Sequence, residues 1–145
     1  MNKNIYAALT VGLIGCFGYG ITELFVRGRT HITMGLLGAV AMIAIHLLSE
    51  NITDIRSLLC AMLISAFFIT CCEFAAGEYL NIMRKMHIWD YSSLPFNIDG
   101  QVCPRYSLAW SFLSLAGFRL DKAVRARAFS ANKNGAAPLS EAPLS

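Results

Sequence analysis

Long apolar runs separated by short polar turns constrain this chain more than any other feature. The first run covers residues 5–26, where only Thr10, Thr22 and Glu23 are clearly polar. As an α-helix that rises about 1.5 Å per residue, this run reaches about 33 Å and exceeds the hydrocarbon core of a bilayer, which is about 30 Å thick. We therefore expect it to form a transmembrane helix.

Three further runs repeat the pattern, at 32–48, 55–76 and 104–120, and the last is shorter than the first and third. Of the 145 residues, 56% are hydrophobic and 14% are charged, whereas a soluble domain carries about 25% charged residues. The mean hydropathy of +0.53 agrees, because a soluble protein this small could not bury so much apolar surface. The chain is predicted to be all-α, a polytopic membrane helix bundle of about four transmembrane helices over residues 1–127, followed by a disordered tail over 128–145.

Small side chains recur on one face of the first run. Gly12, Cys16 and Gly20 follow one another at four-residue spacing, and such faces let helix backbones approach closely in lipid. We predict that another helix packs against this face, and that helix could belong to a second copy of the chain in a homo-oligomer. The five cysteines are odd in number and show no CxxC spacing, so neither a disulfide framework nor a metal site is predicted, and no cofactor is expected.

The longest interior segment that is not apolar is residues 88–110, which begins after the third run and extends into the start of the fourth. Residues 79–88 before it mix apolar and basic side chains, which predicts a short amphipathic helix at the membrane surface. The Asp99-Gly100 pair predicts a turn inside the segment. Pro104 suits the first turn of the last helix, where its missing N–H costs nothing, and Thr53 or Asp54 is expected to cap the third helix.

Four crossings would place both termini on one side of the membrane and the 88–110 segment on the other. Glu23 and Glu73 end the first and third runs, so they would share the membrane face of that segment. Lys and Arg are slightly in excess on the terminal side, which favours the cytoplasm for that side. The expected localisation is the cell membrane, multi-pass, with cytoplasmic termini.

Glu23 and Glu73 are the sharpest candidates for chemistry. Partial desolvation and the negative end of the helix dipole both disfavour a carboxylate in the last turn of an apolar helix. Two explanations stay open: an acid here binds a proton, a cation or a cationic substrate, or it forms an ion pair with an arginine of the same face. The structural ion-pair candidates are Arg27, Arg105 and Glu78.

Asp90 is the next candidate, because it lies between Trp89 and Tyr91. Two aromatic rings beside an acid can bind a cation, since ring faces attract positive charge. The same residues can equally form an interfacial aromatic belt with a helix-capping aspartate. Asn97 is grouped with this candidate ion-binding site, although its simplest role, shared with Asp99, is to hold the turn through bonds to the backbone.

Spaced motifs run through the second half of the chain: Glu73 and Glu78, Trp-Asp-Tyr-Ser (89–92), Pro-Phe-Asn (95–97), Gly-Gln-Val-Cys (100–103) and Ser-Leu-Ala-Trp (107–110). Together they resemble the ABC-transporter type IV family, also called CmpB-like, of small bacterial multi-spanning membrane proteins. Glu23 followed by Arg27 is similar to the family's early helix. The resemblance covers about residues 12–118. Pro104 departs from the family pattern, in which an apolar residue usually follows the Cys, so the entry to the last helix is expected to differ from that of the family.

The resemblance implies a permease. Because the chain has no nucleotide-binding motif, an ATPase would be a separate subunit. Our leading hypothesis is transport, with Glu23, Glu73, Asp90 and Tyr91 lining a vestibule for a cation or small polar solute. Two alternatives stay open: a non-transporting scaffold or regulator, with Trp-Asp-Tyr-Ser as a structural clamp, and a small membrane enzyme acting on lipid or envelope precursors.

No known catalytic motif fits the sequence. If the protein is a membrane enzyme, its general acid and base would therefore be Asp or Glu side chains. The charged residues form no Lys/Arg run that suits nucleic acid. The expected partners are the lipid bilayer, a separate ATPase subunit and a second copy of the chain.

Overall fold

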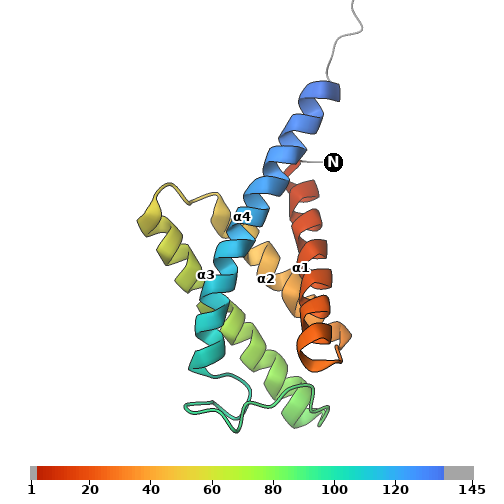
Figure 1. The fold of residues 1–145 in the computed structure, drawn as a ribbon, viewed down its shortest axis with the longest axis vertical. Helices are drawn as coiled ribbons and strands as arrows, with labels where there is room; N and C mark the ends of the chain where they lie inside the picture. The colour runs from red at the N-terminus through yellow and green to blue at the C-terminus, as the bar shows by residue number, and fades with distance from the viewer. Residues whose placement is uncertain (1–2, 136–145) are drawn as a thin grey trace, which may run out of the picture.

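Four long helices make up a bundle (Figure 1). The computed structural model describes residues 3–135, with side chains over 5–25 and 28–127. In chain order, the elements are α1 (Lys3–Arg27), α2 (Ile32–Ser49), α3 (Ile55–Gly77), a π-helical turn η1 (Glu78–Met83) that continues α3, and α4 (Pro104–Gly135). Over the described residues there is no strand, only an isolated antiparallel bridge between Ile98 and Val102.

The predicted bounds of the first three helices agree closely with the structure, whereas the last helix is longer than predicted. Asp54 caps α3, and its carboxylate and Ser57 bond reciprocally in a capping box, which satisfies N–H groups that have no partner within the helix. α4 begins at Pro104, as predicted. It continues past residue 120 to Gly135 because no proline interrupts it before Pro138. The helix therefore occupies the first part of the predicted tail 128–145, and residues 136–145 lie outside the described residues.

The tightest packing joins α1 and α2. A Cβ atom added to Gly15 would lie 2.4 Å from the carbonyl oxygen of Gly38, and one added to Gly38 would lie 2.5 Å from that of Gly15. The two backbones can approach this closely only because both residues lack a side chain. α2 also contacts α3 and α4, and α4 contacts α1 and α3. Over residues 3–135, the backbones of α1 and α3 do not come close to one another.

The small-residue face of α1 is turned inward. An added Cβ on Gly12 would lie 3.3 Å from Ile43, and the Cys16 sulfur would lie 3.0 Å from a Cβ on Gly35. Gly20 lies nearer the α1–α2 turn, beside Thr30. Because α2 covers Gly12 and Cys16, this face is not open to a second copy of the chain.

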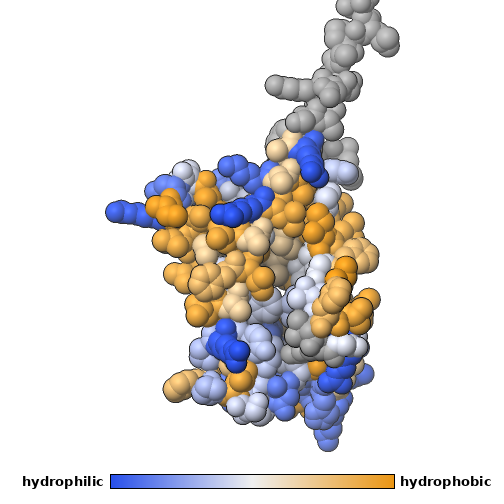
Figure 2. Space-filling view, in the orientation of Figure 1, coloured by the Kyte–Doolittle hydropathy of each residue, from blue (hydrophilic) through white to orange (hydrophobic). Residues whose placement is uncertain are grey.

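The exterior of the bundle is apolar. Large side chains such as Phe17, Leu36 and Phe67 are exposed along the helices, and apolar side chains dominate the middle of the face in Figure 2, with hydrophilic ones towards its two ends. Three helical segments are long and apolar enough to cross a membrane: Ile5–Phe25, Ile32–Ser49 and Ile55–Met83. The protein is thus a helical membrane bundle. α4, the predicted fourth crossing, is more polar than these three segments and is not among those apolar enough to cross a membrane by length and composition.

The segment between α3 and α4 lies across one end of the bundle, next to the α1–α2 turn (Figure 1). The amphipathic helix expected over 79–88 is represented by η1, which ends at Met83. Lys85 and His87 have positive φ angles of 53° and 48°, and this left-handed conformation cannot continue a right-handed helix. Residues 84–103 are therefore an irregular loop.

Candidate functional site

A tight turn shapes the far part of the loop. Asp99 and Gly100 have φ angles of 49° and 68°, and the Ile98 N–H donates to the Val102 carbonyl at 2.9 Å. Two successive positive φ angles make this a primed turn, for which an Asp-Gly pair is well suited. Gly100 is needed for space as well, because an added Cβ would lie 2.5 Å from the Ser92 hydroxyl. The predicted turn is confirmed.

Asp90 is exposed and takes part in this local fold. Its carboxylate accepts hydrogen bonds from the backbone N–H of Ser92 at 2.8 Å and from the hydroxyl of Ser92. The hydroxyl bond, followed by the backbone bond, lowers the pKa of Asp90 below its ordinary value. The carboxylate is thus engaged in a turn rather than aimed at Glu73.

Asn97 also serves the loop backbone. Its amide nitrogen donates to the Leu94 carbonyl at 2.7 Å, and its oxygen accepts from the Gly100 N–H at 3.0 Å. These bonds have the side-chain to backbone character that was expected for Asn97.

Trp89, Asn81 and Gln101 fasten the loop to the end of α3. The indole N–H of Trp89 donates to the Gln101 carbonyl at 2.9 Å. The Asn81 amide donates to the Trp89 carbonyl at 3.0 Å and to the Gln101 side-chain oxygen at 2.8 Å. Gln101 lies directly over Gly77, where an added Cβ would come within 2.5 Å of it. All three polar residues are buried, so their mutual bonds offset the cost of removing them from water.

Glu73 lies under this loop and is 1% exposed. One carboxylate oxygen accepts from the Tyr91 hydroxyl at 3.0 Å, and the other accepts from the Trp110 indole N–H at 3.0 Å. The Tyr91 ring stacks on Tyr106 with centroids 4.5 Å apart, and Trp110 packs against Tyr19 with centroids 5.5 Å apart. A single buried acid therefore orients aromatic side chains from the loop, α4 and, through Trp110, α1.

Glu23 is 7% exposed and lies across from this cluster on α1. It lines a groove of about 450 Å³ between α1 and α4, together with Tyr19, Tyr91 and Trp110. This is the hollow region between the two helices in Figure 2. Glu23 thus shares a cavity with the aromatic side chains that Glu73 holds, although Glu73 itself does not line the groove.

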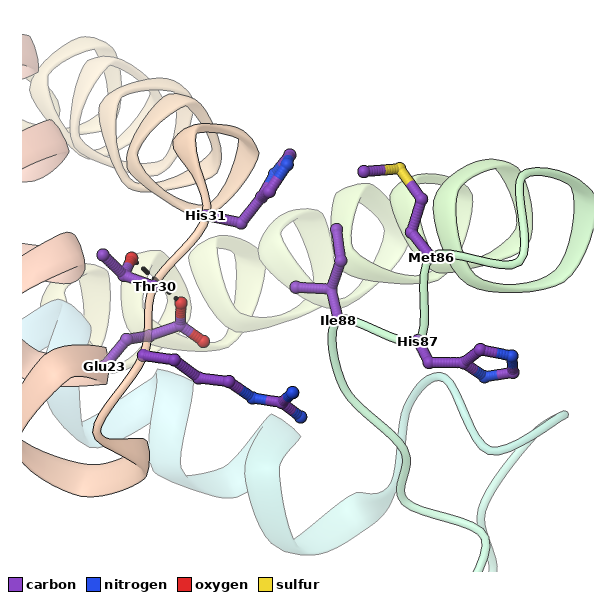
Figure 3. Close-up of a pocket in the computed structure, with 7 residues that line it drawn as sticks. Glu23, Thr30, His31, Met86, His87 and Ile88 are labelled. Atoms are coloured by element: carbon purple, nitrogen blue, oxygen red, sulfur yellow. Dashed lines mark hydrogen bonds between the residues drawn. The ribbon is translucent and has the colours of Figure 1, made fainter.

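Glu23 also lines a second, smaller cavity of about 150 Å³ between the α1–α2 turn and residues 86–88. In this cavity the Thr30 hydroxyl donates to Glu23 at 3.3 Å. Figure 3 shows Glu23 and Thr30 on one side of the cavity, with Ile88 and Met86 on the other and the His87 ring pointing away from Glu23. Glu23 therefore lies where an apolar groove meets a polar cavity.

The remaining predicted site residues lie elsewhere. Arg105 is exposed, and no ion pair joins it to a side chain that the structure describes. One carboxylate oxygen of Glu78 is buried without a hydrogen-bond partner within the described part of the chain. The side chain of Arg27 lies outside the described residues. Among the described residues no group of three or more His, Cys, Asp or Glu side chains could hold a metal ion.

An ion-pair network that the sequence reasoning missed lies at the opposite end of the bundle. The Asp121 side chain is fully buried and is bonded to His46, to the Ser49 hydroxyl and, at 2.8 Å, to Arg125. Arg125 also pairs with Glu50 at 2.8 Å. Burial by itself would raise the pKa of Asp121, but the bonds from Ser49, His46 and Arg125 outweigh it and lower that pKa. The i, i+4 spacing of Asp121 and Arg125 was the available sequence signal.

Comparison with known proteins places the chain in a family. No curated protein matches the sequence, and no solved structure does. The model of one family, described as "Putative ABC-transporter type IV", matches residues 13–137. The match includes the Trp-Asp-Tyr-Ser loop, the residues that fasten it to α3, and all of α4. Because this match covers far more than half of the chain, the protein belongs to the ABC-transporter type IV family.

Proposed function

We propose that the protein is the membrane-spanning component of a transport system and that a cation or small polar solute binds at the Glu23 end of the groove between α1 and α4. In this proposal α4 makes a fourth crossing, and a separate subunit supplies ATP hydrolysis. The family assignment and the apolar helices support the class of protein. The position of Glu23, in both the groove and the polar cavity, carries the choice of site.

The aromatic walls of the groove favour a cationic solute. Tyr19, Tyr91 and Trp110 line it beside Glu23, and ring faces attract positive charge when water is excluded. A carboxylate at the same point supplies the opposite charge. Glu73 then acts as a positioning residue, because the hydrogen bonds that it accepts from Tyr91 and Trp110 hold these rings at the groove wall.

Binding of tetramethylammonium to the purified protein in phosphatidylcholine nanodiscs tests the site. Calorimetry should detect binding to the wild type, and Glu23→Gln should weaken it about tenfold, since attraction between two unit charges about 4 Å apart contributes about 1–4 kcal/mol at a protein surface. The matched control is Asp99→Asn. Asp99 is an exposed acid in the loop at the same end of the bundle, and Asn tolerates its positive φ angle. Equal affinity in the wild type and Glu23→Gln would remove the site from the proposal.

A second candidate function, a scaffold or regulator that transports nothing, is favoured by one observation. Trp89, Asp90 and Asn97 all use their polar groups inside the loop, as a structural clamp would. In that case Glu23→Gln and Tyr91→Phe should lower the melting temperature in detergent while no variant changes a response to tetramethylammonium. Wild-type binding that Glu23→Gln abolishes without a loss of thermal stability excludes the scaffold.

A further inference from the structure

We propose that the solute is a single-chain amphiphile with a cationic head, whose head contacts Glu23 and whose apolar chain lies in the groove between α1 and α4. This inference rests on the proposed function and names the ligand class of the same site. It follows from the shape of the groove, from the small residues that form its floor and from the order of charges at its polar end.

The shape of the groove suits one chain. On α1 its lining residues extend from Ile14 to Glu23, which at 1.5 Å per residue is about 14 Å along the helix. This is roughly half of a hydrocarbon core about 30 Å thick, the depth of one leaflet. Away from the Glu23 end the walls are apolar side chains: Ile14, Met42, Ile45, Ile69, Leu113 and Leu120.

Small residues keep the groove open. Gly15 and Gly38 line it at the point where α1 and α2 approach most closely, and Gly117 lines it from α4. A Cβ added to Gly18, which also lines the groove, would meet no atom within 4 Å. The space beside Gly18 is thus not needed for packing within the chain, and a bound chain can occupy it.

The order of charges selects the head group. Glu23 is the acid that lines both cavities, whereas Arg29 lines only the outer one. A ligand chain that leaves the groove therefore meets a negative charge first and a positive charge second. In phosphatidylcholine or phosphatidylethanolamine the negative phosphate lies next to the chains and the amine lies outside, which is the reverse order. A cation attached directly to an alkyl chain has the order that this site requires.

Quenching of tryptophan fluorescence can test the inference, because Trp110 lines the groove while Trp89 is buried in the loop. The protein is placed in phosphatidylcholine nanodiscs and titrated with three undecyl amphiphiles brominated near the head: a trimethylammonium, an alcohol and a carboxylate. The trimethylammonium amphiphile should quench at a mole fraction about tenfold lower than the alcohol does, because its charge is attracted to the carboxylate of Glu23.

Two variants and two matched controls show where the head group and the alkyl chain of the amphiphile bind. Glu23→Gln should abolish the preference for trimethylammonium over the alcohol, and Asp99→Asn should keep it. Gly18→Leu fills the groove without a clash at Cβ and should weaken quenching by the trimethylammonium amphiphile severalfold. Cys60→Leu adds a similar side chain at an exposed position of α3 outside the groove and should leave quenching unchanged.

The outcomes separate this inference from the proposed function. Equal quenching by all three amphiphiles means that the groove is filled by any lipid chain, and a preference for the carboxylate means that the basic residues select the head; either result overturns the inference. If tetramethylammonium binds through Glu23 but Gly18→Leu does not weaken the long-chain cation, the site for a small cation stands and the amphiphile is excluded. Trp110→Phe should remove the quenching signal, which confirms that it arises in the groove.

Discussion

At the scale of single residues, the partners of each acid define its role. Glu73 is buried between the Tyr91 hydroxyl and the Trp110 indole, and Asp121 is buried between Ser49, His46 and Arg125. Asp90 is exposed and holds a turn, whereas Glu23 lines two cavities. Four carboxylates that look alike in the sequence therefore have different environments, and their substitution should have different consequences.

Tyr91→Phe should destabilise the bundle by about 1 kcal/mol, the scale of a side-chain hydrogen bond inside a membrane protein. The substitution removes the hydroxyl that donates to Glu73 and keeps the ring that stacks on Tyr106. Unfolding in mixed micelles measures the difference. Tyr79→Phe is the control, because Tyr79 is 52% exposed and should change nothing. If both variants match the wild type, the bond does not contribute to stability.

Asp121 should make the stability of the protein sensitive to acid. Because its pKa is lowered in the folded state, its stabilising contribution is fully present above the ordinary value near 3.9 and is lost as the pH falls through the folded pKa. Melting temperatures between about pH 6 and 2 should show a decline below about pH 4 in the wild type that Asp121→Asn flattens, starting from a lower value. The same decline in Asp121→Asn would show that the acid sensitivity does not come from Asp121.

At the scale of helices, glycines three residues apart on α1 differ in function. Gly15 lies against the backbone of α2, while Gly18 faces the open groove. The sequence pattern predicted a small-residue face at Gly12, Cys16 and Gly20, but the closest approach occurs one residue away from that series. Four-residue spacing deviates from the helix period of 3.6 residues, so the pattern alone does not determine which neighbouring position lies at the crossing.

Gly15→Ala should therefore destabilise the α1–α2 pair by about 1–3 kcal/mol, the usual cost of adding atoms to a packed contact. Gly18→Ala is the matched control and should be neutral or slightly stabilising, since alanine has the higher helix propensity. Chemical unfolding of the two variants in the same detergent makes the comparison. A neutral Gly15→Ala would show that α1 and α2 can separate at their crossing without loss of stability.

At the scale of the whole molecule, the bundle has two polar ends with different structures. One end carries the loop of residues 84–103 and Glu23, and the other carries the network of Asp121 and Arg125 and the α2–α3 turn (Figure 1). Three helices are apolar enough to cross a membrane. Whether the two ends face opposite sides of the membrane depends on α4.

Cysteine labelling can establish the fourth crossing. Asn51→Cys, Ser93→Cys and Lys122→Cys introduce thiols at exposed positions in the α2–α3 turn, the loop and α4. With four crossings, an impermeant thiol reagent applied to intact cells should treat positions 51 and 122 alike and position 93 oppositely. Labelling of 122 together with 93 would mean that α4 does not cross. The unsubstituted chain gives the background from the native cysteines.

Features that depend on neighbours in the chain could be predicted from the sequence. The helix bounds, the Asp54 cap, the Asp99-Gly100 turn and the start of α4 at Pro104 follow from local hydropathy and backbone preferences. The prediction that Glu23 and the loop lie at the same end of the bundle follows from the number of helices. The family resemblance was recognised from the spaced motifs and is confirmed by the family match.

Only the tertiary structure decided which side chains meet. Glu73 and Trp110 are 37 residues apart, and His46 and Asp121 are 75 apart, so their contact depends on the rotation of each helix about its axis and on close packing between helices. Gln101 and Asn81 were missed for the same reason, because their importance comes from the loop folding back onto Gly77. By itself the sequence determined an apolar helical bundle with acids at one end, since hydropathy is a property of each segment. The division between a structural acid, Glu73, and an acid that joins two cavities, Glu23, arises only once the helices have packed.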